Sequence, residues 1–189
     1  MNRKQALARI AIVLGGTVTG ADFFLSGCRN IDKKNSAGLF KEKDAALLDE
    51  IAETIIPQTD TPGAKEAQVG SFITQFVQDC YSEEEQQIFL RGLISLKQLA
   101  IKKYNRDFLK LNSKERLILL RLIDQEAQDY TKHKTDNEPA HYFRMLKELT
   151  VLGYFTSKPG ATQSLRFIAV PGGYKGCIPY KKGERAWAL

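Results

Sequence analysis

The chain has 189 residues, of which 43% are apolar and 26% are charged, and these proportions are typical of a globular protein. At roughly 100–200 residues per domain, this length predicts one domain with terminal extensions. The 28 Lys and Arg against 22 Asp and Glu give a net charge of +6, which is too mild to indicate a nucleic-acid partner. The composition also excludes collagen, coiled coils, low-complexity chains and proteins with several membrane spans.

The first 27 residues have the pattern of an export signal. Residues 1–9 contain Arg3, Lys4 and Arg9 and no acid, and an apolar stretch follows over residues 10–25. That stretch is shorter than the ~20 residues that a helix needs to span a bilayer. A basic start, a short apolar stretch and small residues at its end are typical of a signal peptide. We therefore expect the chain to be exported and residues 1–27 to be removed.

The four residues Leu25-Ser26-Gly27-Cys28 resemble a lipobox. Small side chains before the cysteine let a signal peptidase reach the backbone, and the thiol of Cys28 can accept a diacylglyceryl group. Two or more acyl chains hold a protein stably on a membrane, whereas one chain binds it only marginally. We predict that Cys28 is lipidated on the periplasmic side of a bacterial membrane, with residues 28–40 as a tether. The alternative is a short N-terminal helix with a buried free cysteine.

Residues 2–7 (NRKQAL) also resemble a twin-arginine signal, which directs export of folded proteins. The weakly apolar stretch that follows favours this route. Lys4 stands where the pattern has its second arginine, and this departure argues against it. Export in the folded and in the unfolded state are therefore both compatible with the leader.

Residues 41–156 are predicted to form about five amphipathic helices, because apolar residues recur there every three to four positions. The first helix begins at Lys41 and is ended by Pro57. The second covers residues 69–80. The third begins at Ser82, and the three glutamates that follow favour the positive end of a helix.

The fourth helix is expected to be capped by Asn112 or Ser113, and Pro139 suits the first turn of a fifth helix. The polar residues 132–138 between them are expected to be exposed. The pattern predicts an all-α, bundle-like body. The residues expected to line one side of each helix are all apolar except Thr54: Ala46, Leu47, Ile51, Thr54, Ile55, Phe72, Ile73, Phe76, Val77, Cys80, Phe89, Leu93, Leu96, Ala100, Leu117, Leu120, Ile123, Ala127, Tyr142, Met145, Leu146, Leu149 and Leu152.

Residues 157–189 break this pattern and are expected to form an irregular tail. They contain five glycines and three of the six prolines, and only residues 165–170 suit a short strand. Irregular segments of this length are uncommon in compact domains unless they are functional or disordered. Exposed apolar surface costs about 25 cal/mol per Å², so either the protein's own helices or a partner must cover the tail. The residues expected to contact a partner are Tyr154, Phe155, Phe167, Tyr174, Tyr180 and Trp187.

The sequence shows no catalytic or cofactor-binding motif. His133 and His141 are not at the spacing of metal ligands, either from each other or from a cysteine. The C-x-x-C-H motif of c-type haem, the G-x-G-x-x-G motif of dinucleotide sites and the G-x-S-x-G motif of hydrolases are absent. We therefore expect this chain to have no catalytic, cofactor or metal site of its own.

Two cysteines remain if Cys28 carries lipid, and an exported protein can form disulfides. Cys80 and Cys177 can pair with each other, one of them can bridge to a partner, or both can stay reduced. All three states are compatible with the sequence, because spacing alone does not define pairing.

Three segments occur in a characteristic order: residues 51–64 (IAETIIPQTDTPGA), residues 149–160 (LTVLGYFTSKPG) and residues 170–179 (VPGGYKGCIP), with Trp187 near the C-terminus. Together they resemble the gluconate 2-dehydrogenase subunit 3 family over residues 39–189. The resemblance implies a small, non-catalytic accessory subunit of a membrane-associated sugar or sugar-acid dehydrogenase.

In such complexes a large flavoprotein of the glucose–methanol–choline oxidoreductase family holds FAD and the catalytic groups, and a c-type cytochrome passes the electrons onward. The resemblance implies that this chain carries the export signal, helps the flavoprotein to reach the periplasm, stabilises it by wrapping its surface and, through lipid, attaches it to the membrane. The alternative is a free-standing periplasmic lipoprotein that binds a small ligand or a surface partner. An autonomous hydrolase is disfavoured, because no nucleophile–base motif is visible.

Overall fold

The computed structural model describes residues 38–135, 137–170, 172–173, 176–179 and 181–188. Residues 39–189 form one compact unit. The predicted signal peptide, Cys28 and residues 28–37 of the tether lie outside the described residues, as do Tyr174 and Tyr180.

The described part of the chain is all-α, which confirms the predicted fold class. Within these residues the only β-pairing is an isolated bridge between Arg166 and Trp187, so the segment 165–170, which suited a short strand, pairs at a single residue. None of the helices described is both long enough and apolar enough to cross a membrane. The helices are α2 (Glu42–Ile55), α3 (Val69–Cys80), α4 (Glu83–Tyr104), α5 (Ser113–His133) and α6 (Tyr142–Thr156), with a 3₁₀ turn η1 (Phe108–Lys110) and a π turn η2 (Gly160–Ser164).

Local capping sets where α4 and α5 begin. The Ser82 hydroxyl accepts a hydrogen bond from the backbone N–H of Glu85, whose carboxylate accepts one from the backbone of Ser82. Asn112 and Glu115 form the same reciprocal pair at the start of α5. Each pair satisfies two backbone donors that the helix itself leaves without partners. Asn112, one of the two predicted caps, is therefore the N-cap of α5.

The start of α6 differs from the prediction that Pro139 opens it. The helix begins at Tyr142, and the Nδ1 atom of His141 accepts a hydrogen bond from the backbone N–H of Phe143. Pro139 lies outside the helix, and its carbonyl accepts a hydrogen bond from the Tyr130 hydroxyl at 3.1 Å. A side-chain cap, rather than the fixed backbone angle of proline, therefore defines this helix end.

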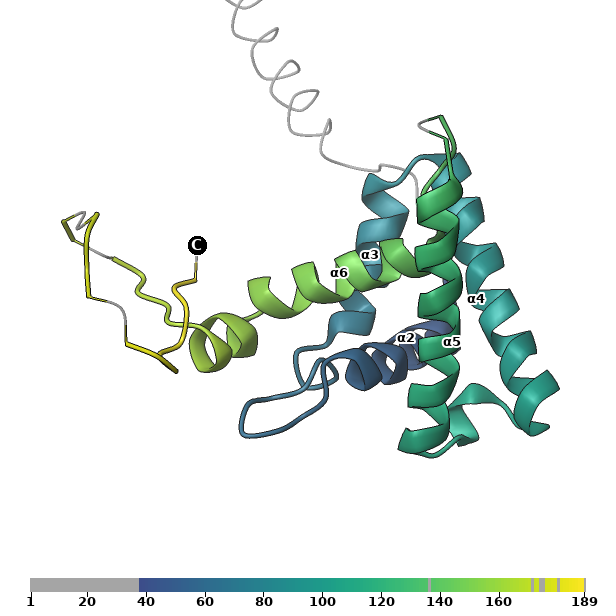
Figure 1. Ribbon diagram of the computed structural model, residues 1–189, viewed down its shortest axis with the longest axis horizontal. Helices are drawn as coiled ribbons and strands as arrows, with labels where there is room; N and C mark the ends of the chain where they lie inside the picture. The colour runs from purple at the N-terminus through teal and green to yellow at the C-terminus, as the bar shows by residue number, and fades with distance from the viewer. Residues whose placement is uncertain (1–37, 136, 171, 174–175, 180, 189) are drawn as a thin grey trace, which may run out of the picture. The chain divides into compact units, whose positions relative to one another are not determined.

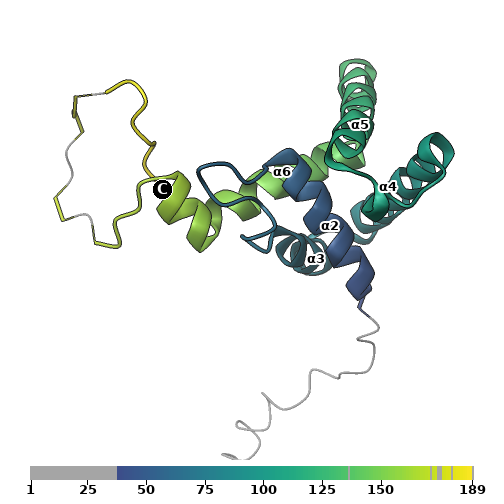
Figure 2. The same ribbon diagram turned by 90° about the horizontal axis from the view of Figure 1, so that it is seen from below.

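Helix α6 contacts all four other α-helices and η2, and α2 also packs on α3 and α5 (Figures 1 and 2). Close contact needs glycine at several positions, of which Gly92 and Gly153 are two. A Cβ atom on Gly92 of α4 would lie 2.0 Å from Cγ of Tyr142, and one on Gly153 of α6 would lie 2.5 Å from Cδ1 of Phe72. The two glycines thus let side chains of neighbouring helices approach the helix backbone.

The predicted core of α4 is confirmed, since Phe89, Leu93, Leu96 and Ala100 are all buried. Several other predicted core residues are not buried. In α2 the buried face is Leu47, Leu48, Ile51 and Ala52, so Ala46 points to solvent. Three further expected core residues are exposed, because no other helix covers the side of the helix on which they lie: Cys80, Leu117 and Leu152.

Candidate interaction surface

One face of the molecule, formed by α3 and α6, contains almost no charge. Residues 67–78 and 149–157 include no Asp, Glu, Lys or Arg, although 26% of the whole chain is charged. The two helices pack against each other, so these segments form one surface, which we call the α3–α6 face. Depletion of charged residues is typical of the centre of a protein–protein interface.

The α3–α6 face is hollowed along the side chain of Phe72. A hollow of about 320 Å³ lies between Gln68 and Phe72 on one side and Gly153 and Thr156 on the other. A second hollow of about 240 Å³ continues past Phe72 and Phe76. Aromatic rings, uncharged polar groups and a glycine line the first hollow, and Asp79 and Cys80 border the far end of the second. The first hollow therefore suits inserted apolar or amide side chains.

An aromatic ladder borders the same face. The ring centroids of Phe72 and Phe76 are 5.5 Å apart, and those of Phe76 and Tyr81 are 5.9 Å apart. Burial, assisted by Glu85 and Glu148, raises the pKa of Tyr81 above its usual value. The first pair of rings is tilted and the second is T-shaped, and rings packed in this way provide rigid, largely apolar contact area.

The outer side of α6 continues the apolar surface. Val151, Leu152 and Phe155 are 48%, 43% and 40% exposed. Phe155 is held in a T-shaped contact with Tyr154, with centroids 5.1 Å apart. Three neighbouring exposed apolar residues on one helix are a larger apolar patch than scattered surface leucines, and such patches mark interaction sites.

Of the residues expected to contact a partner, Tyr154 is placed inside the protein. Its side chain is 2% exposed, and its hydroxyl donates a 2.6 Å hydrogen bond to the carbonyl of Pro62. The same hydroxyl lies 2.6 Å from Oγ of Ser164. Tyr154 thus joins α6 to η2 and to the loop after α2, and it is not exposed to a partner, whereas its neighbour Phe155 is 40% exposed.

The tail is closed into a loop by contacts around Arg166. The backbone N–H of Arg166 donates to the carbonyl of Ala186, and the N–H of Ala188 donates to the carbonyl of Arg166, both at 2.8 Å. The guanidinium pairs with Glu184 at 2.7 Å and lies 4.3 Å from the ring centroid of Trp187. These contacts tie residues 184–188 to the start of the tail and close a loop between them.

Apolar side chains of this loop remain at the surface. Phe167, Ile168, Ile178 and Trp187 are about half exposed, and Val170 is 83% exposed. One of the two alternatives for the tail was that the protein's own helices cover it. For these residues they do not. Phe155, Phe167 and Trp187 remain available to a partner.

The remaining cysteines lie at the surface. Cys80 and Cys177 are both exposed and are not bonded to each other in this structure. Cys80 borders the hollow next to Phe76. The alternatives of a reduced thiol and of a bridge to a partner both remain compatible with this placement.

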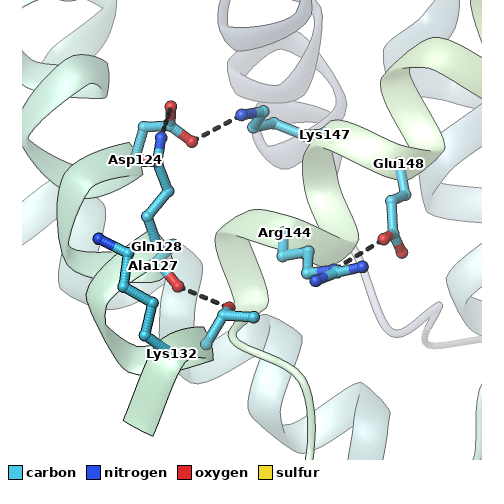
Figure 3. Close-up of a pocket in the computed structure, with 8 residues that line it drawn as sticks. Asp124, Ala127, Gln128, Lys132, Arg144, Lys147 and Glu148 are labelled. Atoms are coloured by element: carbon cyan, nitrogen blue, oxygen red, sulfur yellow. Dashed lines mark hydrogen bonds and ion pairs between the residues drawn. The ribbon is translucent and has the colours of Figure 1, made fainter.

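A separate hollow of about 380 Å³ lies between α5 and α6 (Figure 3). Its charged groups already have partners: Lys147 binds Asp124 at 2.6 Å, and Arg144 binds Glu148 at 2.9 Å. Gln128 donates a further hydrogen bond to Asp124. No charge in this hollow is left to orient a ligand, so the α3–α6 face and the tail loop are the better candidate site. No group of three or more metal-ligating side chains is arranged around a common point among the residues described.

Comparison with protein families gives one match. The profile described as gluconate 2-dehydrogenase subunit 3 matches residues 42–172, which include all five α-helices, η2 and the beginning of the tail loop. No curated protein and no solved structure matches the chain.

Proposed function

The chain belongs to the gluconate 2-dehydrogenase subunit 3 family, and on this basis we propose that it is the non-catalytic small subunit of a membrane-associated, FAD-dependent dehydrogenase of gluconate or a related sugar. Membership makes it an accessory subunit of a dehydrogenase complex. The FAD-binding partner is a flavoprotein of the glucose–methanol–choline type, and a c-type cytochrome accepts the electrons. The chain itself contributes binding surface rather than redox groups.

The observation that carries this proposal is the uncharged, partly apolar α3–α6 face, together with the exposed side chains of the tail loop. Exposing apolar surface to water costs a free energy of about 25 cal/mol per Å². Covering Leu152, Phe155 and Trp187 by a partner recovers that free energy. The flavoprotein subunit is the partner whose surface this chain would cover and stabilise.

Export and attachment complete the proposed role. The basic leader with Arg3 and Lys4 directs the chain across the membrane, and lipid on Cys28 then holds the complex on the periplasmic side. Anchoring brings the flavoprotein close to a membrane-bound electron acceptor. Only export in the folded state would let this chain carry a bound flavoprotein with it.

Co-purification of a tagged chain from its own cells tests the proposal. We expect a flavin-containing protein to elute with it, detected by flavin fluorescence. The double variant Leu152→Asp/Phe155→Asp should lose this protein, because two charges would be buried without partners at the interface. The control Ile94→Asp/Leu122→Asp changes two equally exposed residues on α4 and α5 and should retain it. The proposal is wrong if no flavoprotein elutes with the wild-type chain.

Truncation after Ser157 separates the tail loop from the helical body. Among the described residues beyond this point only Gly160 is buried, so the far-ultraviolet circular dichroism of the body should persist. Flavoprotein binding should be weakened. A complete loss of helix would show instead that the tail covers the core of its own domain.

A further inference from the structure

One short segment has an unusually large excess of positive over negative charge. Residues 102–121 contain seven basic and two acidic residues, a net charge of +5 out of +6 for the whole chain. This segment consists of the last residues of α4, the turn η1 and the first half of α5, and the two helices meet there at one end (Figure 1). We call it the basic end. Its basic residues are Lys102, Lys103, Arg106, Lys110, Lys114, Arg116 and Arg121.

Two of these seven residues have a structural role. Arg116 pairs with Glu50 of α2 and donates hydrogen bonds to the carbonyls of Phe108 and Leu109. Arg106 pairs with Glu115. The other five form no salt bridge within the described part of the chain, and all five are exposed: Lys102, Lys103, Lys110, Lys114 and Arg121.

Exposed apolar side chains alternate with these cations. Ile101 is 52% exposed, Leu109 is 39% exposed and Ile118 is 49% exposed. The turn that carries Leu109 is fixed in place, because Phe108 beside it is fully buried and the Asp107 carboxylate accepts a hydrogen bond from the backbone N–H of Leu109. The structure therefore holds Leu109 at the surface, next to Lys110 in the chain.

We propose that the basic end docks on the surface of a bilayer that contains anionic lipids. Segments that lie in a membrane interface typically combine lysine and arginine with exposed leucine and isoleucine. Their cations contact the headgroups, and their apolar side chains enter the boundary of the acyl chains. Long lysine side chains can extend to the headgroups while their stems stay on apolar surface. This contact is independent of flavoprotein binding and of lipid on Cys28, and it would orient the subunit on the membrane.

A bilayer fits this surface better than an acidic protein does. The apolar side chains project from a turn and two helix ends, and none of them lines the hollows on α3, α5 and α6. A projecting set of apolar and basic groups can enter a deformable lipid surface, whereas a protein interface requires a shaped complement.

Vesicle sedimentation tests this proposal with the full chain carrying Cys28→Ala, so that no lipid is attached. The vesicles contain phosphatidylcholine with or without phosphatidylglycerol. The variant K102Q/K103Q/K110Q/K114Q should bind the anionic vesicles at least about tenfold more weakly than its parent. The matched control K43Q/K158Q/K181Q/K182Q removes four exposed lysines elsewhere and should bind within about twofold of the parent, since the leader is common to all variants.

Fluorescence tests whether the turn enters the lipid. In a Trp187→Phe background, Leu109→Trp should shift its emission to the blue on addition of anionic vesicles, whereas Val170→Trp in the tail loop should not. The proposal is overturned if the basic-end variant binds like its parent, if the control loses as much affinity, or if binding does not depend on phosphatidylglycerol. The proposal would also be overturned if the basic-end variant still bound vesicles like its parent but no longer co-purified with an acidic protein that the parent binds.

Discussion

Replacing Tyr154 by phenylalanine removes a single hydroxyl group from the protein interior and leaves the ring in place. That hydroxyl donates to the carbonyl of Pro62, which lies in the loop after α2, and it also contacts Ser164 of η2. The substitution therefore tests whether Tyr154 holds the fold together or belongs to the partner surface. The two roles predict opposite results for stability and for binding.

The magnitude follows from burial. Tyr154 is 2% exposed, so removal of its hydroxyl leaves the Pro62 carbonyl without a donor in a site closed to water. An unsatisfied buried polar group costs about 1–3 kcal/mol. At roughly 2–4 °C per kcal/mol for a domain of this size, a loss of ~2 kcal/mol lowers Tm by about 4–8 °C.

The assay is urea and thermal unfolding followed by far-ultraviolet circular dichroism. Tyr130→Phe is the matched control, because its hydroxyl also donates to a proline carbonyl, that of Pro139, but at an exposed site. Water replaces the lost donor there, so we expect the control to change stability by less than ~0.5 kcal/mol. Co-purified flavin should be unchanged in both variants.

Equal stability of the Tyr154→Phe variant and the wild type would refute this reasoning. It would mean that the Pro62 carbonyl finds water or another donor without cost. If the variant lost flavoprotein binding but kept its stability, Tyr154 would instead belong to the surface that contacts the partner.

Three further predictions concern other parts of the chain. Gly92→Ala should lower the midpoint of urea unfolding: helix propensity favours alanine by about 1 kcal/mol, but the new Cβ would overlap the ring of Tyr142, and such overpacking costs about 1–3 kcal/mol. Burial holds the pKa of His141 below 6.5, although Glu126 acts in the opposite direction. Since the unfolded chain then binds the proton more tightly, stability should fall as the pH drops below 6.5, and less so in His141→Asn, which keeps an N-cap. Finally, Cys28→Ala should reduce the membrane-bound fraction in cells, and unchanged fractionation at high salt would contradict lipid anchoring.

The ends of the helices were predictable where the signal is local. Residues 69–80 form a helix with the predicted bounds, and the Ser82 and Asn112 caps lie where the sequence places them. A cap joins residues three positions apart, so it is visible in a short window of sequence. The prediction that Pro139 begins α6 was wrong, because the side chain of His141, two residues further on, caps the helix.

The interaction surface was only partly predictable. Phe167 and Trp187 in the tail were candidate partner contacts, and both are exposed. The α3–α6 face was missed, although its signal, two segments without any charged residue, is present in the sequence. Recognising it requires knowing that α3 and α6 pack side by side, and the helices are separated by more than sixty residues.

Helical periodicity, caps and the order of the family motifs therefore established an all-α subunit of a known family, because each of these signals acts over a few residues. Whether Tyr154 faces inward and whether Leu152 faces outward both depended on how the helices cross. Those crossings arise from contacts between residues far apart in the chain, such as Gly92 against Tyr142 and Tyr154 against Pro62, and periodicity within one helix contains no information about them.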